Sequence, residues 1–284
     1  MSLITDQLAQ RIASAKAFIF DMDGTIALGN AASGGHEALP GAIELLDAIR
    51  RLGKPFRVFT NGTGKPPAIY AAGLRQAGFD IADDEFMTPS TAAAIWFEQQ
   101  GIGKVRVLGR DGVAAPLRER GIECVEPAAE ASGVEAVYTG WFREFTFPDL
   151  EAACKSIWDG AILTSASHVP FFATADGRAI GASFALNVMI QSLTDTELTV
   201  LGKPSVTAFN SALAGMGLSP ADSRDVVIVG DDPVLEIGMA KATGAFGVGM
   251  TTGLMKRDTI DQLPPEQRPE LLIDDLATLH AVIS

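Results

Sequence analysis

The stretch KAFIFDMDGT, Lys16 to Thr25, decides the fold that this sequence predicts. Its apolar run, Ala17 to Phe20, ends in two carboxylates, Asp21 and Asp23, and a Gly-Thr pair then stops the strand. A short apolar run closed by a polar turn is typical of a buried strand in a parallel sheet. Because ligands of open α/β sheets bind at the carboxyl ends of such strands, we expect both aspartates at the mouth of a site.

The pair Asp21 and Asp23 carries a chemical requirement of its own. Two carboxylates held close together repel each other unless a proton or a bound cation offsets the charge. The plain alternative is that Asp-x-Asp-Gly forms only a polar turn after a strand. The other strand ends of the chain are needed to distinguish a site from a turn.

Composition bounds the class of protein. The chain has 284 residues, 47% of them hydrophobic, which predicts a globular protein with a sizeable core in one large or two moderate domains. The net charge of −13 argues against nucleic acid or an anionic membrane as the main partner. A small phosphorylated ligand remains compatible with that charge, because local groups decide its binding.

The signals for cellular compartment agree with one another. Cys124 and Cys154 lack the spacing of zinc sites or redox motifs and are predicted to be buried thiols of a reducing compartment. No apolar run reaches about 18 residues, and the N-terminal segment lacks the features of a signal peptide. We therefore expect a cytoplasmic protein without a transmembrane helix.

The first part of the chain alternates helices and strands, which indicates a parallel sheet. In order, we expect a helix at 4–15 capped by Thr5 or Asp6, the strand Ala17–Phe20, a loop at 26–38, a helix opened by Pro40, the strand Phe56–Phe59 and a helix closed near Gly78.

The pattern then restarts, and we interpret residues 87–194 as a second α/β domain inserted into the first. Its expected elements are helices at about 90–100, 112–120, 147–158 and 183–193, and strands at Val105–Leu108, Ala136–Tyr138 and Ala161–Thr164. Asp176-Gly177 is expected to form a hairpin turn. Aromatic residues concentrate in this block, and we expect most of them in its core: Trp96, Phe97, Trp141, Phe142, Phe145 and Phe147.

After this block the first pattern resumes, so residues 1–86 plus 195–284 are expected to form one core domain. Its later elements are strands at Leu198–Leu201, Val226–Val229, Ala245–Val248 and Leu271–Ile273, and helices ending near 215 and covering 234–242 and 275–282. The predicted fold class is α/β, with a parallel-sheet core and an inserted α/β domain.

Four strand ends carry polar groups that would meet along one edge of a parallel sheet. They are Asp21 with Asp23, Thr60 with Asn61, Lys203, and Asp231 with Asp232. Carboxylate oxygens suit Mg²⁺, and a hydroxyl, an amide and an ammonium suit phosphoryl oxygens. An aspartate is ionised at neutral pH and can act as a nucleophile, provided that Mg²⁺ and the lysine offset its repulsion from a phosphate dianion.

These motifs resemble those of the haloacid dehalogenase (HAD) superfamily, specifically its NagD-like, p-nitrophenylphosphatase-like phosphatases with a large C2-type cap (class IIA). The matching segments are Asp21-Met22-Asp23-Gly24-Thr25, Thr60-Asn61-Gly62-Thr63, Lys203 in Gly-Lys-Pro, and Gly230-Asp231-Asp232 with Glu236. Their order and spacing cover nearly the whole chain. The resemblance implies a Rossmann-like core, residues 1–86 plus 195–284, and a cap, residues 87–194, that closes over the site and sets substrate specificity.

The resemblance also implies a role for each residue in Mg²⁺-dependent hydrolysis of a small phosphomonoester through an aspartyl-phosphate. Asp21 would be the nucleophile, and Asp23 the general acid and base. The metal would be held by Asp21, the backbone carbonyl of Asp23 and Asp231. The transferring phosphoryl group would be held by Thr60, Asn61, Gly62 and Lys203. Asp232 and Glu236 would act one layer behind the metal ligands.

Three segments depart from the pattern of the subfamily. Gly62 stands where relatives usually have Asn, and it offers phosphate only its backbone N–H. Glu236 is one methylene longer than the usual Asp. Ser165-Ala166-Ser167-His168 replaces the Asn-Pro-Asp that relatives carry in the cap, which leaves inherited substrate specificity open and makes His168 a candidate substrate contact.

Each of these residues also has an ordinary interpretation. Thr60 and Asn61 could cap a turn, Asp231 could cap the following helix, Lys203 and Glu236 could be solvated charges, and His168 could be a surface or packed histidine. The segment Gly62-Thr63-Gly64-Lys65-Pro66 is not a P-loop, since it lacks the first Gly and the Ser/Thr after Lys.

Three other functions share parts of this pattern. A phosphotransferase or phosphomutase would use the same aspartyl-phosphate with an alcohol acceptor. A 2-haloacid dehalogenase would share the fold without Mg²⁺ and normally without an acid at the position of Asp23. A non-catalytic binding module would bind without turnover. The substrate remains open among sugar phosphates, phosphoglycolate, glycerol phosphate, nucleotides and pyridoxal phosphate, and the resemblance implies that a homodimer can form through the cap.

Overall fold

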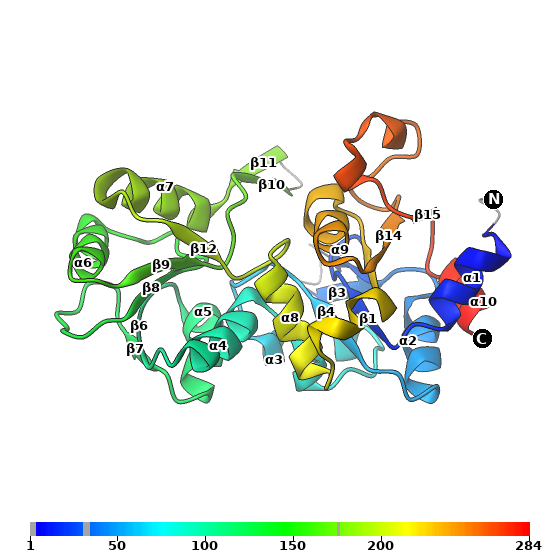
Figure 1. Cartoon of the computed structure of the whole chain (residues 1–284), viewed down its shortest axis with the longest axis horizontal. Coiled ribbons are helices and arrows are strands. Elements are labelled where there is room, and N and C mark those ends of the chain that lie inside the picture. The colour runs from blue at the N-terminus through cyan, green and yellow to red at the C-terminus, as the bar shows by residue number, and fades with distance from the viewer. Residues whose placement is uncertain (1–3, 31–34, 175–176) are drawn as a thin grey trace. The chain divides into compact units, whose positions relative to one another are not determined.

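The computed structural model describes residues 4–30, 35–174 and 177–284, and its fold is α/β (Figure 1). The chain divides into two compact units. One comprises Met1–Thr60, Ala68–Met87 and Ala212–Ser284, and the other comprises Asn61–Pro67 and Thr88–Ser211. Among the described residues, none of the helices has the length and apolar character needed to cross a membrane.

The first unit is built on a six-stranded sheet in which every pair is parallel. The strand order is β15 (Leu271–Ile273), β14 (Phe246–Met250), β13 (Val226–Gly230), β1 (Ala17–Phe20), β4 (Phe56–Phe59) and β5 (Phe86–Met87). Both central strands, β1 and β13, are buried along their whole length. This burial explains why they read as unbroken apolar runs, because a strand with helices on both faces has no solvent side.

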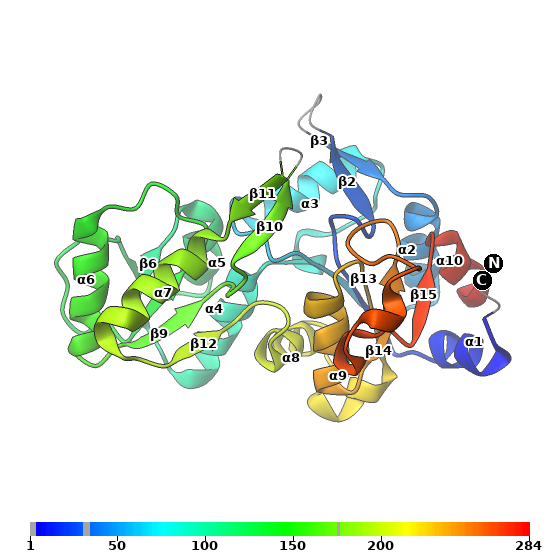
Figure 2. The same cartoon turned by 90° about the horizontal axis from the view of Figure 1, so that it is seen from above.

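Alternate residues of the central strands face opposite layers of helices. Phe18 and Phe20 belong to one core cluster with residues of α1 (Asp6–Ala13), α2 (Ala42–Arg51), α3 (Pro67–Gln76) and α10 (Ala277–Ile283). The helices α1 and α10 lie side by side near the two chain ends (Figure 2). The helix α1 begins as expected, since the Thr5 side chain accepts a hydrogen bond from the Leu8 N–H.

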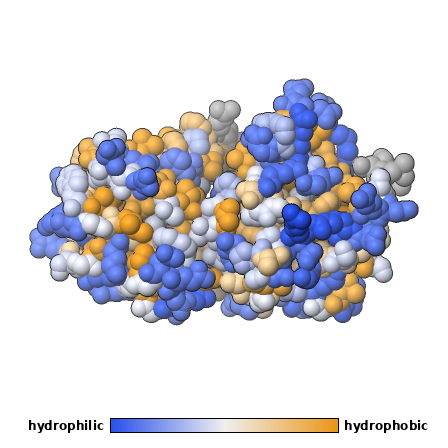
Figure 3. Space-filling view, in the orientation of Figure 1, coloured by the Kyte–Doolittle hydropathy of each residue, from blue (hydrophilic) through white to orange (hydrophobic). Residues whose placement is uncertain are grey.

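The second unit is built on a five-stranded parallel sheet with helices on both faces. Its strand order is β12 (Leu198–Val200), β9 (Ile162–Ser165), β8 (Ala136–Thr139), β6 (Lys104–Leu108) and β7 (Glu123–Val125). One face packs on α4 (Pro89–Gln100) and α5 (Asp111–Glu119), and the other on α6 (Phe147–Trp158) and α7 (Ala182–Thr194). Figure 3 shows one side of the whole molecular surface, on which hydrophobic residues are interspersed with hydrophilic ones.

Two sequence predictions are wrong at the level of strands. Residues 26–38 contain an antiparallel pair, β2 (Ala27–Asn30) and β3 (Gly35–Ala38), instead of a loop. The strand β12 pairs with β9 at the edge of the second sheet, although we expected it to resume the first. Its three residues are only half-buried, unlike β1, and an apolar run this short does not specify which sheet it joins.

Three shorter elements escaped the sequence analysis or fall partly outside the described residues. The strands β5 and β7 have only two and three residues, too few to show an alternating pattern. Asp176 lies outside the described residues, but the strands on either side, β10 (Phe171–Thr174) and β11 (Gly177–Ile180), pair antiparallel. The helix expected at 234–242 is a π-turn, Pro233–Ile237, followed by α9 (Gly238–Thr243).

The predicted division at residues 87 and 194 differs from the two compact units at both ends. The second unit includes residues 61–67 and 195–211, which the sequence analysis assigned to the core. Helix α8 (Val206–Gly215) crosses from the second unit to the first. The functional division into core and cap stays a prediction.

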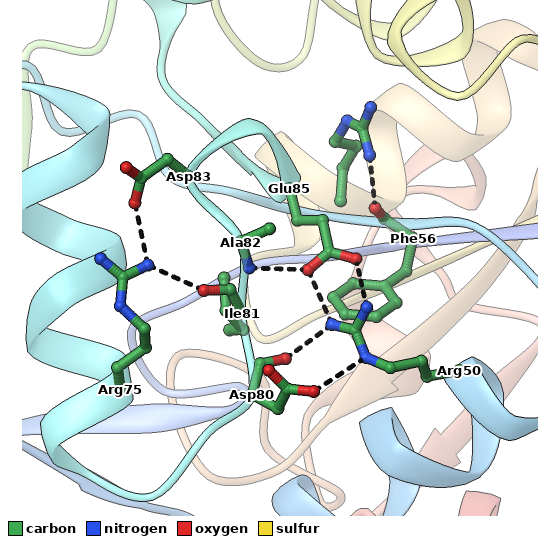
Figure 4. Close-up of polar contacts among 9 residues, drawn as sticks. Arg50, Phe56, Arg75, Asp80, Ile81, Ala82, Asp83 and Glu85 are labelled. Atoms are coloured by element: carbon green, nitrogen blue, oxygen red, sulfur yellow. Dashed lines mark hydrogen bonds and ion pairs between the residues drawn. The ribbon is translucent and has the colours of Figure 1, made fainter.

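An ion-pair network fixes the segment that leads into the edge strand β5 (Figure 4). Arg50, near the end of α2, donates from Nη1 and Nη2 to the two carboxylate oxygens of Glu85, at 2.9 and 2.7 Å. The same carboxylate accepts the Ala82 N–H at 2.9 Å. The hydrogen bonds that the Arg50 guanidinium donates to Glu85 raise its pKa, and the guanidinium also lies over the Phe56 ring.

We predict that Glu85→Gln lowers the free energy of unfolding by about 1–2 kcal/mol, because it breaks a paired, charge-assisted contact with a mostly buried carboxylate. Urea denaturation would measure the change. Asp83→Asn is the matched control. It breaks the ion pair between Asp83 and Arg75, two exposed side chains, and should lower the free energy of unfolding by less than about 0.5 kcal/mol. Equal losses of unfolding free energy in the two variants would contradict a stabilising role for the Arg50–Glu85 contact.

Candidate active site

The first unit brings two predicted carboxylates to the ends of adjacent strands. Phe20 of β1 pairs with Val229 of β13, and the Asp21 N–H continues the ladder by donating to the Val229 carbonyl at 2.9 Å. Asp21 and Asp231 therefore leave the sheet side by side, at 9% and 8% exposure. Two carboxylates this buried at neighbouring strand ends repel each other strongly unless positive charge is supplied.

Backbone atoms from two loops surround the Asp231 carboxylate. The Leu254 N–H donates to Oδ2 at 3.0 Å, and the Met255 N–H donates to the Asp231 carbonyl at 3.0 Å. A Cβ at Gly24 would lie 2.9 Å from the carboxylate carbon, and a Cβ at Gly253 would overlap Oδ2. Glycine is therefore required at both positions for the backbone to approach this side chain.

Residues Thr251–Leu254 form part of the site, although the sequence analysis assigned them to no element and to no site. The Thr252 hydroxyl donates to the Gly24 carbonyl, which joins this loop to the turn that follows β1. The only sequence signal was Gly253 itself, and one glycine does not distinguish a close approach from an ordinary turn.

Asp232 and Glu236 form a reciprocal pair at the start of the π-turn. Asp232 Oδ1 accepts the N–H groups of Val234 and Leu235 at 2.7 and 3.1 Å, while Glu236 Oε2 accepts the Asp232 N–H at 3.1 Å. The helix cap is thus Asp232, so the capping alternative for Asp231 is wrong. Glu236 is 1% exposed, so the solvated alternative is wrong as well.

Asp23 and Thr60 occupy different environments within the same unit. The Asp23 side chain is exposed, and its residue forms a bridge with Ala27 at the start of the hairpin β2–β3. Thr60 is 6% exposed and directly follows β4, where its N–H donates to the Met87 carbonyl at 3.2 Å. The described residues contain no group of three or more His, Cys, Asp or Glu side chains arranged to hold a metal ion.

The second unit contains the other half of the predicted phosphate-binding set. Asn61 Oδ1 accepts the Lys203 N–H at 2.9 Å, and Asn61 Nδ2 donates to the Lys203 carbonyl at 2.9 Å. This two-point contact, the Asn61–Lys203 clamp, joins segments that are 142 residues apart. Lys203 is 1% exposed, so the interpretation as a solvated charge is wrong.

The loop after Asn61 is anchored within the second unit. Thr63 Oγ1 accepts the Trp141 N–H at 3.0 Å, and a Cβ at Gly112 would overlap the Thr63 carbonyl. Thr60 and Asn61 are consecutive, so the peptide bond between them links the two groups of site residues. His168 belongs to the second unit and is exposed, which agrees with its alternative interpretation as a surface histidine.

Comparison with known proteins decides the family. A family model described as haloacid dehalogenase-like hydrolase matches residues 18–123, and one described as HAD-hydrolase-like matches residues 200–279. The human haloacid dehalogenase-like hydrolase domain-containing protein 2 is 30% identical over 88% of this chain and 89% of that protein. The chain belongs to the haloacid dehalogenase-like hydrolases. It is therefore an enzyme of the hydrolase class.

Solved structures confirm the expected fold and subfamily of this HAD hydrolase. The p-nitrophenyl phosphatase of Archaeoglobus fulgidus superimposes with a TM-score of 0.81 at 25% identity, covering 95% of this chain and 98% of that one. NagD of E. coli K-12 superimposes with a TM-score of 0.80 at 25% identity, covering 93% and 98%. The roles expected for individual residues stay predictions.

We predict that Gly253→Ala impairs the enzyme, because the new methyl group displaces the Asp231 carboxylate. Phosphate release from p-nitrophenyl phosphate should fall roughly tenfold or more in kcat/KM, equivalent to about 1.4 kcal/mol. The control is Gly103→Ala, where a Cβ meets nothing closer than 3.7 Å. Unchanged kcat/KM in a folded Gly253→Ala variant would show that this contact does not position Asp231.

Proposed function

We propose that this HAD hydrolase is a Mg²⁺-dependent phosphatase that hydrolyses a small phosphomonoester through an aspartyl-phosphate on Asp21. The observation that carries the proposal is the placement of Asp21 and Asp231, two nearly buried carboxylates at adjacent strand ends. A metal ion bound at these strand ends would place positive charge beside both carboxylates. Support for the reaction class comes from the p-nitrophenyl phosphatase of Archaeoglobus fulgidus, to which the chain is similar.

The donor set fits Mg²⁺ better than a softer metal. Asp21, Asp231 and the Asp23 carbonyl offer hard oxygen atoms, and neither cysteine nor histidine belongs to the set. One or two protein carboxylates with water completing the shell is the usual arrangement for Mg²⁺. When bound, the ion would neutralise charge that the nucleophile and the phosphoryl oxygens bring together.

The first proposed step forms the bond from an Asp21 carboxylate oxygen to phosphorus. The bond from phosphorus to the leaving-group oxygen breaks, and Asp23 gives that oxygen a proton. In the second step a water molecule loses a proton to Asp23 and attacks phosphorus, which releases phosphate and regenerates the Asp21 carboxylate.

The remaining site residues are proposed to hold the phosphoryl group. Lys203 would supply positive charge, and Thr60 with the backbone N–H of Gly62 would supply hydrogen bonds. Asn61 would act mainly by fixing the Lys203 backbone, since its amide is engaged there at both ends. Asp232 and Glu236 would hold the turn that presents Asp231.

The setting of the reaction also stays proposed. We propose a small phosphorylated metabolite as the substrate, a cytoplasmic location, and no part for nucleic acid or membrane. Closure of the predicted cap, residues 87–194, would exclude water and favour small diffusible substrates. Light scattering after size exclusion would test the predicted homodimer through this cap.

We predict that Asp21→Asn abolishes phosphate release from p-nitrophenyl phosphate, by at least about 10³-fold in kcat, because an amide is not a competent nucleophile. Wild type should lose activity in EDTA and regain it with Mg²⁺. Acid-quenched turnover should trap phosphate on wild type and not on the variant. Retention of metal-dependent turnover by a folded Asp21→Asn enzyme would overturn the nucleophile assignment.

The rival reactions are separated by their products. A phosphotransferase would form glycerol phosphate or sugar phosphate in excess of free phosphate when an alcohol acceptor is added. A 2-haloacid dehalogenase would release halide in EDTA. A binding module would bind a phosphoester without releasing phosphate.

A further inference from the structure

The loop after strand β14, residues 251–257, contacts both strand ends that carry the proposed metal ligands. The Thr252 hydroxyl donates to the Gly24 carbonyl, which is 228 residues away in the sequence. Two residues further along the loop, the Leu254 N–H donates to Asp231 Oδ2 at 3.0 Å. One short loop therefore holds the turn after β1 and the carboxylate after β13, and all of these residues belong to the first unit.

The Thr252 contact bears on the orientation of the Asp23 carbonyl, a proposed metal ligand. A peptide unit is planar, so the Asp23 carbonyl and the Gly24 N–H turn together. The Gly24 N–H donates to the Ala27 carbonyl at 3.0 Å, which restrains that plane. The Thr252 hydroxyl restrains the next plane through the Gly24 carbonyl. The peptide planes on both sides of the Gly24 α-carbon are thus held.

The two ends of the loop are tied to one carboxylate oxygen. Thr251 Oγ1 donates to Asp274 Oδ1 at 2.8 Å, and Arg257 Nη2 donates to the same atom at 2.7 Å. The Thr251 N–H also donates to the carbonyl of Ile273, the last residue of β15, at 3.0 Å. The hydrogen bond from Arg257 and then that from Thr251 lower the pKa of the Asp274 carboxyl, so this anchor is ionised at neutral pH.

One buried side chain seats the middle of the loop. Met255 is 1% exposed, and a Cβ at Gly249 of β14 would lie 2.9 Å from its sulfur. Thr252 and Asp274 are exposed instead. Substitutions at these two positions therefore remove surface contacts and leave the packing under the loop intact.

We propose that Thr252 is a positioning residue for the metal ion, and that Asp274 keeps it in place by closing the 251–257 loop. The inference rests on the proposed function, because the groups it positions are the Asp23 carbonyl and the Asp231 carboxylate of the proposed Mg²⁺ site. Residues that orient metal ligands raise metal affinity, because less remains to be ordered when the ion binds. This loop would do so for two ligands that come from different strands.

Mg²⁺ binding to the substrate-free enzyme tests the role of Thr252. The rise of the unfolding temperature with Mg²⁺ concentration gives an apparent Kd. In Thr252→Val, which keeps the shape and loses the donor, this Kd should rise about tenfold. Thr252→Ser keeps the hydroxyl and should stay within about threefold of wild type. A Kd of Thr252→Val equal to that of wild type would overturn the positioning role, as would the absence of any Mg²⁺ effect on wild type.

Thr243→Val is the matched control for loss of a hydroxyl hydrogen bond. The Thr243 hydroxyl donates to the Met239 carbonyl at 2.8 Å, within helix α9 of the same unit. This variant should have a lower unfolding temperature in EDTA and an unchanged Kd for Mg²⁺. An equal rise of that Kd in Thr243→Val and Thr252→Val would show that stability sets the metal affinity, and the positioning role would fail.

The adjacent residues Asp274 and Asp275 separate the anchor of the loop from a general loss of stability. Asp275 Oδ1 accepts the N–H and the hydroxyl of Thr278 at the start of α10. Asp274→Ala should raise the Kd for Mg²⁺ about threefold to fivefold and speed hydrogen exchange of residues 251–257 in the metal-free enzyme. Asp275→Ala should change neither quantity.

Equal hydrogen exchange of the loop in these two variants would overturn the role of Asp274. Failure of the phosphatase function gives a different result: wild type would bind Mg²⁺ and hydrolyse no ester. The Mg²⁺ titrations and the hydrogen exchange would then still decide whether the loop positions the metal ligands.

Discussion

The placement of two nearly buried carboxylates at the ends of adjacent strands is the constraint on which the candidate site depends. Asp21 directly follows β1 and Asp231 directly follows β13, so the pairing of these parallel strands places both residues at the same edge of the sheet. The surrounding chain is adapted to that proximity: glycine at 24 and 253 admits backbone against Asp231, and the Leu254 N–H binds its carboxylate. A hydrophobic core of this kind can position such groups because its close packing resists the shifts that would relieve the repulsion.

A second constraint concerns the residues that support the proposed reacting groups. Their polar groups form hydrogen bonds with neighbouring residues of the site. Asp232 and Glu236 hold a turn together, and Asn61 holds Lys203. Removing a single member of such a pair leaves a buried partner without its hydrogen bond, which costs more than the pair contributes when intact. Neighbouring acidic or amide residues that look equivalent in the sequence thus have different structural roles in the fold.

The sequence predicted the central strands and the carboxylate pair well, because full burial and strand-end polarity both leave a signal in consecutive residues. Strand β12 was placed in the wrong sheet because its neighbour is chosen by tertiary packing and not by its own residues. Thr252 was missed for a related reason: only the fold brings its hydroxyl to the Gly24 carbonyl, 228 residues away. Gly253 was visible but ambiguous, since the side chain that requires it is distant in sequence.

The Asn61–Lys203 clamp has a consequence for how this chain can change. It ties together two points 142 residues apart, so the segment between them is a closed loop whose base is fixed by two hydrogen bonds. The entropic cost of closing a loop rises only slowly with its length. Material can therefore be added to or removed from the middle of this loop without altering its base, and an inserted domain can diverge in size and shape while the lysine keeps its place.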